Sequence, residues 1–239
     1  GVAVIHVGTA GPIQAGLIFR VGAADEPLPK RGLTHLVEHL ALHGQVSPAE
    51  HHNGMTGATI TQFVISGSEA QVVRFLNHVC AALRQLPLER LEVERGILQV
   101  ESHSRAAAID DAVGQVRYGA TGLARSAYRE FGIDGPTPEA VVDWARRWFV
   151  SGNAIVWMTT DDLPQGLDLR LPNGPRQDFA VGQSYLSQRP VWFQGQEGLA
   201  LVEAVVPRSS ASNLFADVLS KALFRQLRLE LGYSYSAAA

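Results

Sequence analysis

The segment His35-Leu36-Val37-Glu38-His39 decides how this sequence is interpreted. The surrounding pattern predicts a helix over residues 32–43, with Gly44 placed to end it. Residues three and four positions apart share one face of a helix, so both imidazoles and the carboxylate point to the same side. The rest of this helix is apolar nearly all round, which indicates a buried helix whose polar side chains need partners.

A divalent metal ion would satisfy these three polar side chains. Two imidazoles four residues apart are a standard pair of zinc ligands, and the glutamate between them can hold the metal-bound water. The alternative is a pair of core histidines with ordinary hydrogen-bond partners. We therefore predict a zinc site that includes His35 and His39.

A catalytic zinc site needs a third protein ligand and an open fourth position, and a second predicted helix, 88–105, offers a candidate. With Val93 set at 0° and about 100° per residue, Glu94 and Glu101 fall at about 100° and 80°. Both positions lie in the middle of an apolar arc, so we expect these two carboxylates to point into the core toward a positive charge. Five residues form that arc: Leu91, Val93, Ile97, Leu98 and Val100.

At this point the chain resembles the pitrilysin-type zinc metallopeptidases, or inverzincins, which include insulin-degrading enzyme and the mitochondrial processing peptidase. The motifs that carry the resemblance are His35-x-x-Glu38-His39 and Glu94-Arg-Gly-Ile-Leu-Gln-Val-Glu101. The resemblance covers nearly the whole chain. It also includes residues 22–42, Asn53-Gly54-Met55-Thr56, Asn153-Ala154-Ile155-Val156, and Arg228 with Tyr235 in Leu-Arg-x-x-x-Gly-x-x-Tyr.

The resemblance implies a role for each residue of the two motifs. His35, His39 and Glu101 would bind one zinc ion, and Glu38 would be the general base. Glu94 would be a supporting acidic residue one helical face behind the ligands. His43, four residues beyond His39, is a weaker candidate because the ligand motif is already complete without it.

The resemblance also implies how a peptide substrate is held. The peptide would add as an extended strand beside the segment that follows Asn53. Arg228 and Tyr235 would hold its backbone from the other half of a chamber. We expect the chain to form a homodimer or a heterodimer with a related subunit.

Strands and helices in mixed order predict an α+β fold, with a mixed, mostly antiparallel sheet and helices packed on it. Strands are expected near 2–7, 13–21, 59–66 and 154–160, and a loop over 47–54. Residues 1–175 would form the zinc-binding peptidase domain and 176–189 a linker. Residues 190–239, with a strand over 199–206 and a helix over 212–231, would begin a second, homologous domain that is truncated.

Composition excludes several other classes of protein. A net charge of −3 argues against nucleic-acid binding through a basic face. The single cysteine, Cys80, excludes a disulfide framework and cysteine-rich zinc modules, and we expect it in the core. No apolar run is long enough to cross a bilayer, so we expect a soluble, cytoplasmic protein without membrane contact. The start at Gly1 is also compatible with a removed targeting segment.

Two features of the chain depart from the family pattern. Residues 40–52 separate His39 from Asn53 and residues 40–100 separate His39 from Glu101, and both spacings are shorter than the family usually shows. The chain also stops inside the second unit. The shorter spacing affects the shape of the pocket and its specificity, not the ligands. Two rival functions stay open on other grounds. The first is a non-catalytic scaffold or partner subunit, against which the intact motif counts. The second is a sulfur-ribosyl lyase whose metal would use Cys80, an interpretation in which Glu94 and Glu101 have no place.

Overall fold

The computed structural model describes residues 1–9, 11–44, 51–104, 109–179, 182–187, 190–194, 198–207 and 209–238. The chain divides into two units, Gly1–Gln196 and Glu197–Ala239. The strands of the first unit are β1 (Ala3–His6), β2 (Ile13–Phe19), β3 (His51–Thr56), β4 (Thr61–Gly67) and β5 (Ala154–Met158). Its helices are α1 (Leu33–Leu42), α2 (Glu69–Arg84), α3 (Leu91–Ser104), α4 (Ile109–Tyr118) and α5 (Pro138–Trp148).

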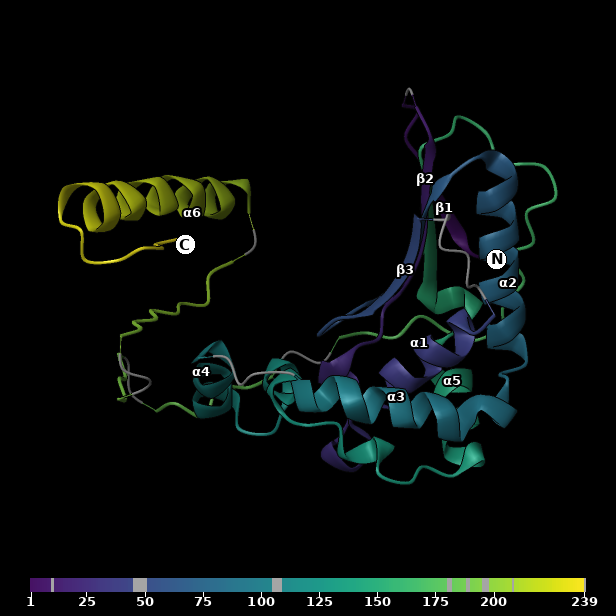
Figure 1. Ribbon diagram of the computed structural model, residues 1–239, viewed down its shortest axis with the longest axis horizontal. Helices are drawn as coiled ribbons and strands as arrows, with labels where there is room; N and C mark the ends of the chain where they lie inside the picture. Colours follow the sequence, from purple (N-terminus) through teal and green to yellow (C-terminus); the bar gives the residue numbers. More distant parts are fainter. Residues whose placement is uncertain are drawn as a thin grey trace. The chain divides into compact units, whose positions relative to one another are not determined.

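The five strands form one sheet in the order β1-β5-β2-β4-β3 (Figure 1). Only the β1–β5 pair is parallel, and the other three pairs are antiparallel. The predicted α+β fold with a mixed, mostly antiparallel sheet is therefore confirmed. Strand β3 stands at one edge of the sheet, and its outer backbone groups have no neighbouring strand among the described residues.

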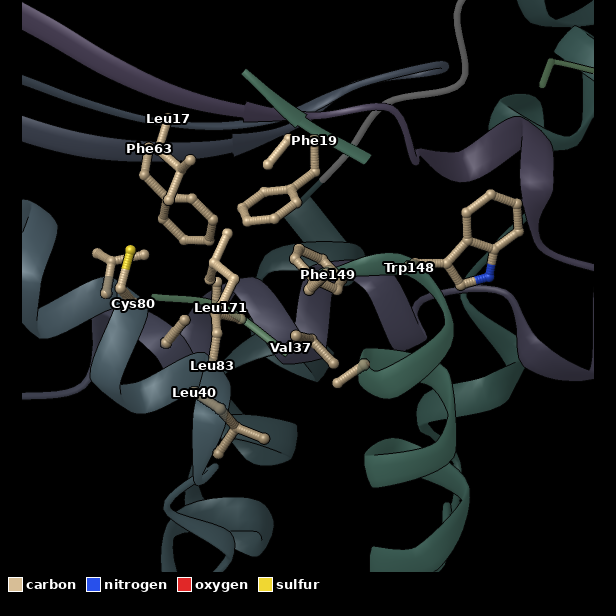
Figure 2. Close-up of a cluster of buried hydrophobic side chains, with 14 of the residues drawn as sticks. Leu17, Phe19, Val37, Leu40, Phe63, Cys80, Leu83, Trp148, Phe149 and Leu171 are labelled. Carbon is tan, nitrogen blue, oxygen red and sulfur yellow. The ribbon is translucent and has the colours of Figure 1, made fainter. Parts of the chain in front are cut away.

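The core lies between this sheet and its helices (Figure 2). Alternate residues of β2 and β4, such as Leu17, Phe19 and Phe63, point to the buried face of the sheet, as the period of two requires. The apolar face of α2 packs against the same two strands. Six residues of that helix are buried, as its periodicity predicts: Val72, Phe75, Leu76, Val79, Cys80 and Leu83.

Helix α1 is the central helix of the first unit, in contact with α2, α3, α5 and strand β3. Its N-cap residue, Gly32, has φ of 102°, a left-handed conformation that side chains rarely adopt. A Cβ at Gly32 would also lie 2.6 Å from Glu130 Cβ and 2.8 Å from Ile133 Cγ2. Glycine at this position therefore allows the segment around Glu130 to lie against the start of α1.

Two local predictions are wrong, and one helix was not predicted. Of the loop expected over 47–54, residues 47–50 lie outside the described residues, but His51–Thr56 is strand β3. Side chains of this strand alternate between exposed and half-buried positions, but polar and apolar residue types do not alternate along it. The sequence therefore shows no period of two. The strand expected over 199–206 is absent, because those residues have no described strand to pair with. Helix α4 was not expected at all.

The second unit contains α6 (Ser210–Leu223), which continues as a π-helical segment, Phe224–Glu230. None of the residues in these two segments is buried. The apolar stripe of α6 is accordingly exposed: Leu214, Phe215, Val218 and Leu219. In the part of the chain that the structure describes, no helix combines the length and apolar character needed to span a membrane.

Candidate metal centre

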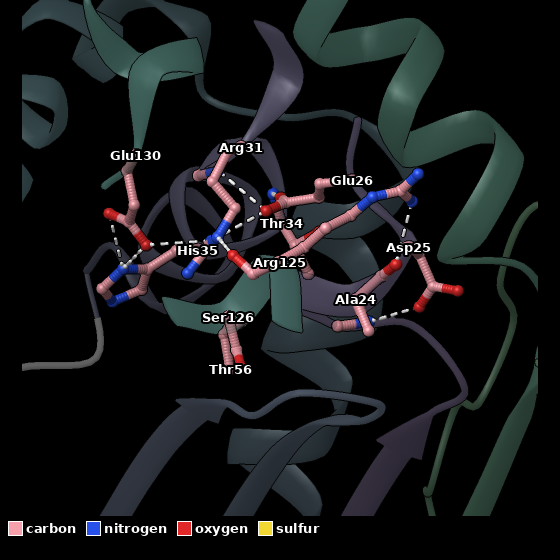
Figure 3. A network of polar contacts seen from close by, with 12 residues as sticks. Ala24, Asp25, Glu26, Arg31, Thr34, His35, Thr56, Arg125, Ser126 and Glu130 are labelled. Carbon is pink, nitrogen blue, oxygen red and sulfur yellow. Dashed lines mark hydrogen bonds and ion pairs between the residues drawn. The ribbon is translucent and has the colours of Figure 1, made fainter. Parts of the chain in front are cut away.

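The start of α1 is anchored by a buried carboxylate (Figure 3). Glu26 is fully buried and accepts hydrogen bonds from the backbone N–H groups of Gly32, at 2.8 Å, and Thr34, at 2.6 Å. Arg31, also buried, donates to the same carboxylate at 2.8 Å. Negative charge at a helix N-terminus is favourable, so this arrangement fixes the first turn of α1, from which His35 projects.

The three motif residues of α1 come together on one face, as their spacing predicts. His35, Glu38 and His39 each offer one potential ligand atom, and these atoms lie within 4.8 Å of one another. The two imidazole rings are 4.9 Å apart and nearly perpendicular. Glu38 is buried, whereas both histidines are partly exposed, so the imidazole edges are accessible from solvent.

Glu101 brings a third side chain to the same place from α3. Its Oε2 atom lies 3.8 Å from His35 Nε2 and 3.8 Å from His39 Nε2. Zinc–ligand bonds of about 2.0–2.2 Å place tetrahedral ligand atoms roughly 3.4 Å apart, so the Glu101 oxygen lies close to the spacing that a shared ion would require from each imidazole nitrogen. The Glu101 side chain is 50% exposed, which leaves this side of the cluster open to solvent.

The donor set fits zinc. Two imidazole nitrogens and one carboxylate oxygen are the ligands of catalytic zinc sites, in which a fourth position stays open. Burial lowers the pKa of His39, with the nearby His35 acting in the same direction, and this favours the neutral, ligating form of the ring. Burial alone would lower the pKa of His35 as well, but the adjoining carboxylates, Glu130 first, raise it.

Glu94 lies behind the candidate ligand His39. Its Oε2 lies 3.5 Å from His39 Nδ1, the nitrogen opposite the one that faces Glu101. Arg90 donates to Glu94 Oε1 at 3.1 Å, and His43 Nδ1 lies 3.9 Å from the same oxygen. Glu94 is therefore buried with partners on both oxygens, and His43 faces this supporting carboxylate.

Glu38 lies in a narrow space between α1 and β3. The hydroxyl of Thr56 donates to its Oε2 at 3.5 Å. A Cβ at Gly54 would overlap Glu38 Oε1 and lie 2.6 Å from Leu42 Cδ1, so the bare backbone of Gly54 makes room for the carboxylate. Burial raises the pKa of Glu38 to about 7, against the opposing effect of His35, so this carboxylate can exchange a proton near neutral pH.

The structure corrects the expected buried arc of α3. Leu91, Glu94 and Leu98 are buried, but Val93, Ile97 and Val100 are exposed. The buried sector is thus narrower than the apolar residues suggest, and Glu101 lies at its margin rather than in the core. Its carboxylate needs less compensation than a buried one, because water reaches it.

Asn53 lies on the edge strand β3, opposite Val64 of β4, and its side chain is exposed. The neighbouring His51 and His52 fall within the segment expected to be a loop but lie on β3, and His52 is half-buried. Its ring packs 5.3 Å from that of Phe75, and its Nδ1 is buried.

Arg228 and Tyr235 are neighbours within the second unit. The Arg228 guanidinium stacks 4.2 Å from the centre of the Tyr235 ring and also donates a hydrogen bond to the Tyr235 carbonyl oxygen. Both side chains are accessible, Tyr235 strongly so. Their relation to a substrate stays a prediction.

Sequence reasoning missed one residue that contacts the ligand set. Glu130 lies 3.2 Å from His35 Nδ1 and 3.4 Å from Arg31. It stands between the short helical turns Gly122–Ala127 and Phe131–Ile133, in a segment without helical or strand periodicity. The one signal in the sequence is Gly32, because a glycine at the start of a helix indicates that another segment, here the one with Glu130, can approach the backbone closely.

Comparison with known proteins gives a match at the level of structure alone. No protein-family sequence model matches the chain, and no curated protein sequence does. Pitrilysin superposes with a TM-score of 0.60 at 17% identity, over 77% of this chain and 23% of that chain. The ferredoxin protease FusC, solved in complex with Arabidopsis ferredoxin, gives 0.61 at 19%, over 75% of this chain and 24% of that chain.

A third similar structure is described as a peptidase M16 inactive domain from Pseudomonas fluorescens. It superposes with a TM-score of 0.58 at 13% identity, over 76% of this chain and 50% of that chain. This chain therefore spans between about a quarter and a half of the length of these three neighbours. At these identities the likeness concerns the fold: the chain has the α+β fold of M16 peptidase domains.

Proposed function

We propose that this chain is the zinc-binding half of a metallopeptidase. The observation that carries the proposal is the position of Glu101 Oε2, 3.8 Å from the Nε2 atoms of both His35 and His39. Three ligands with an open side are what a hydrolytic zinc site requires. The buried Glu38 beside them has only long polar contacts among the described residues, 3.5 Å to the Thr56 hydroxyl and 3.8 Å to His35 Nε2, and a buried carboxylate in such a setting favours a chemical role.

His35, His39 and Glu101 would hold the ion. When bound, zinc supplies Lewis acidity, which makes water more acidic and a peptide carbonyl more electrophilic. Glu38 accepts the proton of the attacking water and passes it to the departing amine nitrogen, and its raised pKa suits both transfers. Glu94 holds the His39 ring in place through Nδ1.

The free edge of β3 supports binding of the peptide as an added strand. An extended backbone can hydrogen-bond to the outer N–H and C=O groups of this strand, and Asn53 and Gly54 lie on it. Glu38 adjoins Gly54, so a peptide on this edge would run past the general base. In this proposal Arg228 and Tyr235 hold the peptide from a second unit.

We further propose the domain division that the family resemblance implies. Residues 1–175 form the zinc-binding domain, residues 176–189 are a linker, and residues 190–239 begin a second, homologous unit. Pairing with a second copy or a related subunit is consistent with neighbours that are about twice as long. One neighbour is described as the first half of the periplasmic protease PqqL from Escherichia coli.

Two other functions are less well supported. The inactive M16 domain among the structural neighbours supports a non-catalytic subunit. Against this, a subunit without catalytic activity would not need the three candidate zinc ligands that this chain carries. The sulfur-ribosyl lyase requires a cysteine at the metal, whereas Cys80 is fully buried in the core on α2.

The direct test is metal-dependent hydrolysis of an unstructured, fluorogenic peptide by the full chain. We expect one zinc ion per chain, slow hydrolysis, loss of hydrolysis after chelation and recovery on adding zinc. Bound zinc without any hydrolysis, also in mixtures with a complementary subunit, would favour the non-catalytic alternative.

A further inference from the structure

Each histidine of the candidate metal centre presents its Nδ1 atom to a carboxylate outside the ligand set. His39 Nδ1 faces Glu94 at 3.5 Å. His35 Nδ1 faces Glu130 at 3.2 Å, a contact that Figure 3 shows. The opposite nitrogens, both Nε2, share Glu101 Oε2 at 3.8 Å. Both rings therefore have the same orientation, with Nε2 toward Glu101 and Nδ1 toward another carboxylate. Glu130, however, comes from a segment to which the proposed function assigns no role.

Glu130 is itself held in place by buried charges. Its side chain is 13% exposed and lies 3.4 Å from Arg31 NH1. Arg31 is 3% exposed, donates to Glu26 at 2.8 Å and donates through Nε to the Arg125 carbonyl oxygen at 2.9 Å. A buried guanidinium with these fixed partners cannot turn away, so it keeps the Glu130 carboxylate beside His35.

The backbone around Glu130 approaches α1 closely. A Cβ at Gly32 would lie only 2.6 Å from Glu130 Cβ and 3.2 Å from its Cγ. This approach requires glycine at the N-cap of α1, three residues before His35. Two separate features, the absence of a side chain at Gly32 and the Glu26–Arg31 pair, thus place one carboxylate against one ring nitrogen.

We infer that Glu130 is the positioning residue for His35. A neutral imidazole carries one proton, and a carboxylate at Nδ1 accepts that proton's hydrogen bond, which leaves the Nε2 lone pair directed toward Glu101. Glu130 therefore selects both the orientation and the tautomer in which His35 can bind a metal ion. The inference rests on the proposed function in taking zinc as the ion that Nε2 meets.

Zinc affinity of the full chain tests this role. Competition with a chromophoric chelator would compare the parent with Glu130→Ala, Glu130→Gln and, as a matched control, Glu139→Ala at an exposed position on α5. We expect Glu130→Ala to bind zinc about 10- to 100-fold more weakly and the control to bind like the parent. Glu130→Gln should fall between them, because its amide oxygen still accepts from Nδ1–H.

A second measurement separates positioning from general damage to the fold. Nitrogen-15 spectra of the histidines in the metal-free chain, above the pKa of the His35 ring, report which nitrogen carries the proton. We expect Nδ1–H for His35 in the parent and a shift toward Nε2–H in Glu130→Ala, with similar urea midpoints. If the alanine variant does not fold, Glu130→Gln carries both comparisons, with a weaker affinity and a partial shift expected.

The two measurements have distinct failures. An unchanged His35 tautomer, or an unchanged zinc affinity, in a folded Glu130 variant would overturn the inference while leaving the proposed function intact. If the parent itself binds no zinc, the proposed function fails, and the tautomer alone then decides whether Glu130 positions His35.

Discussion

Glu101 Oε2 lies 3.8 Å from His39 Nε2, although two strands and a helix separate these residues in the sequence. The contact arises because α3 packs directly on α1. Glu101 stands at the solvent-exposed margin of that packing, where its carboxylate is half-exposed. A ligand in such a position can bind an ion without the cost of burying an unpaired charge beforehand.

Replacing Glu101 should remove the metal. Glu101→Gln leaves a neutral amide in place of the carboxylate, which is a poor zinc ligand, so we predict substoichiometric zinc by elemental analysis. Glu94→Gln should retain most of the zinc but hydrolyse peptide more slowly. Glu94 contacts His39 at Nδ1, not at the Nε2 atom that faces Glu101. The reverse pattern would show that the two glutamates have been assigned to each other's roles.

Enlarging Gly54 should displace the general base. A Cβ there would overlap the Glu38 carboxylate, so Gly54→Ala should lower kcat by about 10- to 100-fold while zinc content stays at that of the parent. Gly96→Ala is the matched control, because a Cβ at Gly96 meets no atom within 4 Å. If Gly54→Ala and Gly96→Ala had equal kcat values, the Glu38 carboxylate could shift away from Gly54 without loss of hydrolysis, and this prediction would be wrong.

The single cysteine should be chemically silent. Burial raises the pKa of the Cys80 thiol to about 12, so at pH 8 only about one molecule in ten thousand carries the thiolate. Because the raised pKa means that the fold disfavours the reactive form, the thiolate fraction is still only about one in a thousand at pH 9, so labelling of the native chain should stay slow compared with that of the unfolded chain. Iodoacetamide labelling followed by mass spectrometry, with a urea-unfolded sample as control, checks this; fast native labelling would place Cys80 nearer the surface.

The second unit should be the less protected part of the isolated chain. No residue of α6 is buried, and an isolated helix of this length is marginal in water. We predict fast amide exchange over 210–230 and strong protection over α1 and α2, measured by hydrogen exchange with mass spectrometry. Strong protection of α6 in a chain shown to be monomeric would contradict this.

The sequence allowed much of the candidate site to be predicted, because its signals are local. The spacing of His35, Glu38 and His39 specifies one face of a helix, and the heptad spacing of Glu94 and Glu101 specifies another. The α+β class followed from element order. What failed depends on contacts between distant segments.

Glu130 could not be found in this way, since its importance comes from meeting His35 across the fold. The strand at His51–Thr56 was mistaken for a loop because its register is set by pairing with β4 rather than by its own composition. Conversely, Val93 and Val100 are apolar yet exposed, since composition does not report which side of α3 faces a neighbour.

In the proposed function, the metal centre hydrolyses peptides with Glu38 as the general base. The most direct test compares the parent with Glu38→Gln at equal, measured zinc content, using kcat/KM for a fluorogenic peptide. We predict zinc occupancy like that of the parent and a fall in kcat/KM of about 100-fold or more, because the amide cannot take up the proton. Equal hydrolysis by the two proteins at matched zinc content would contradict the role of Glu38 as the general base.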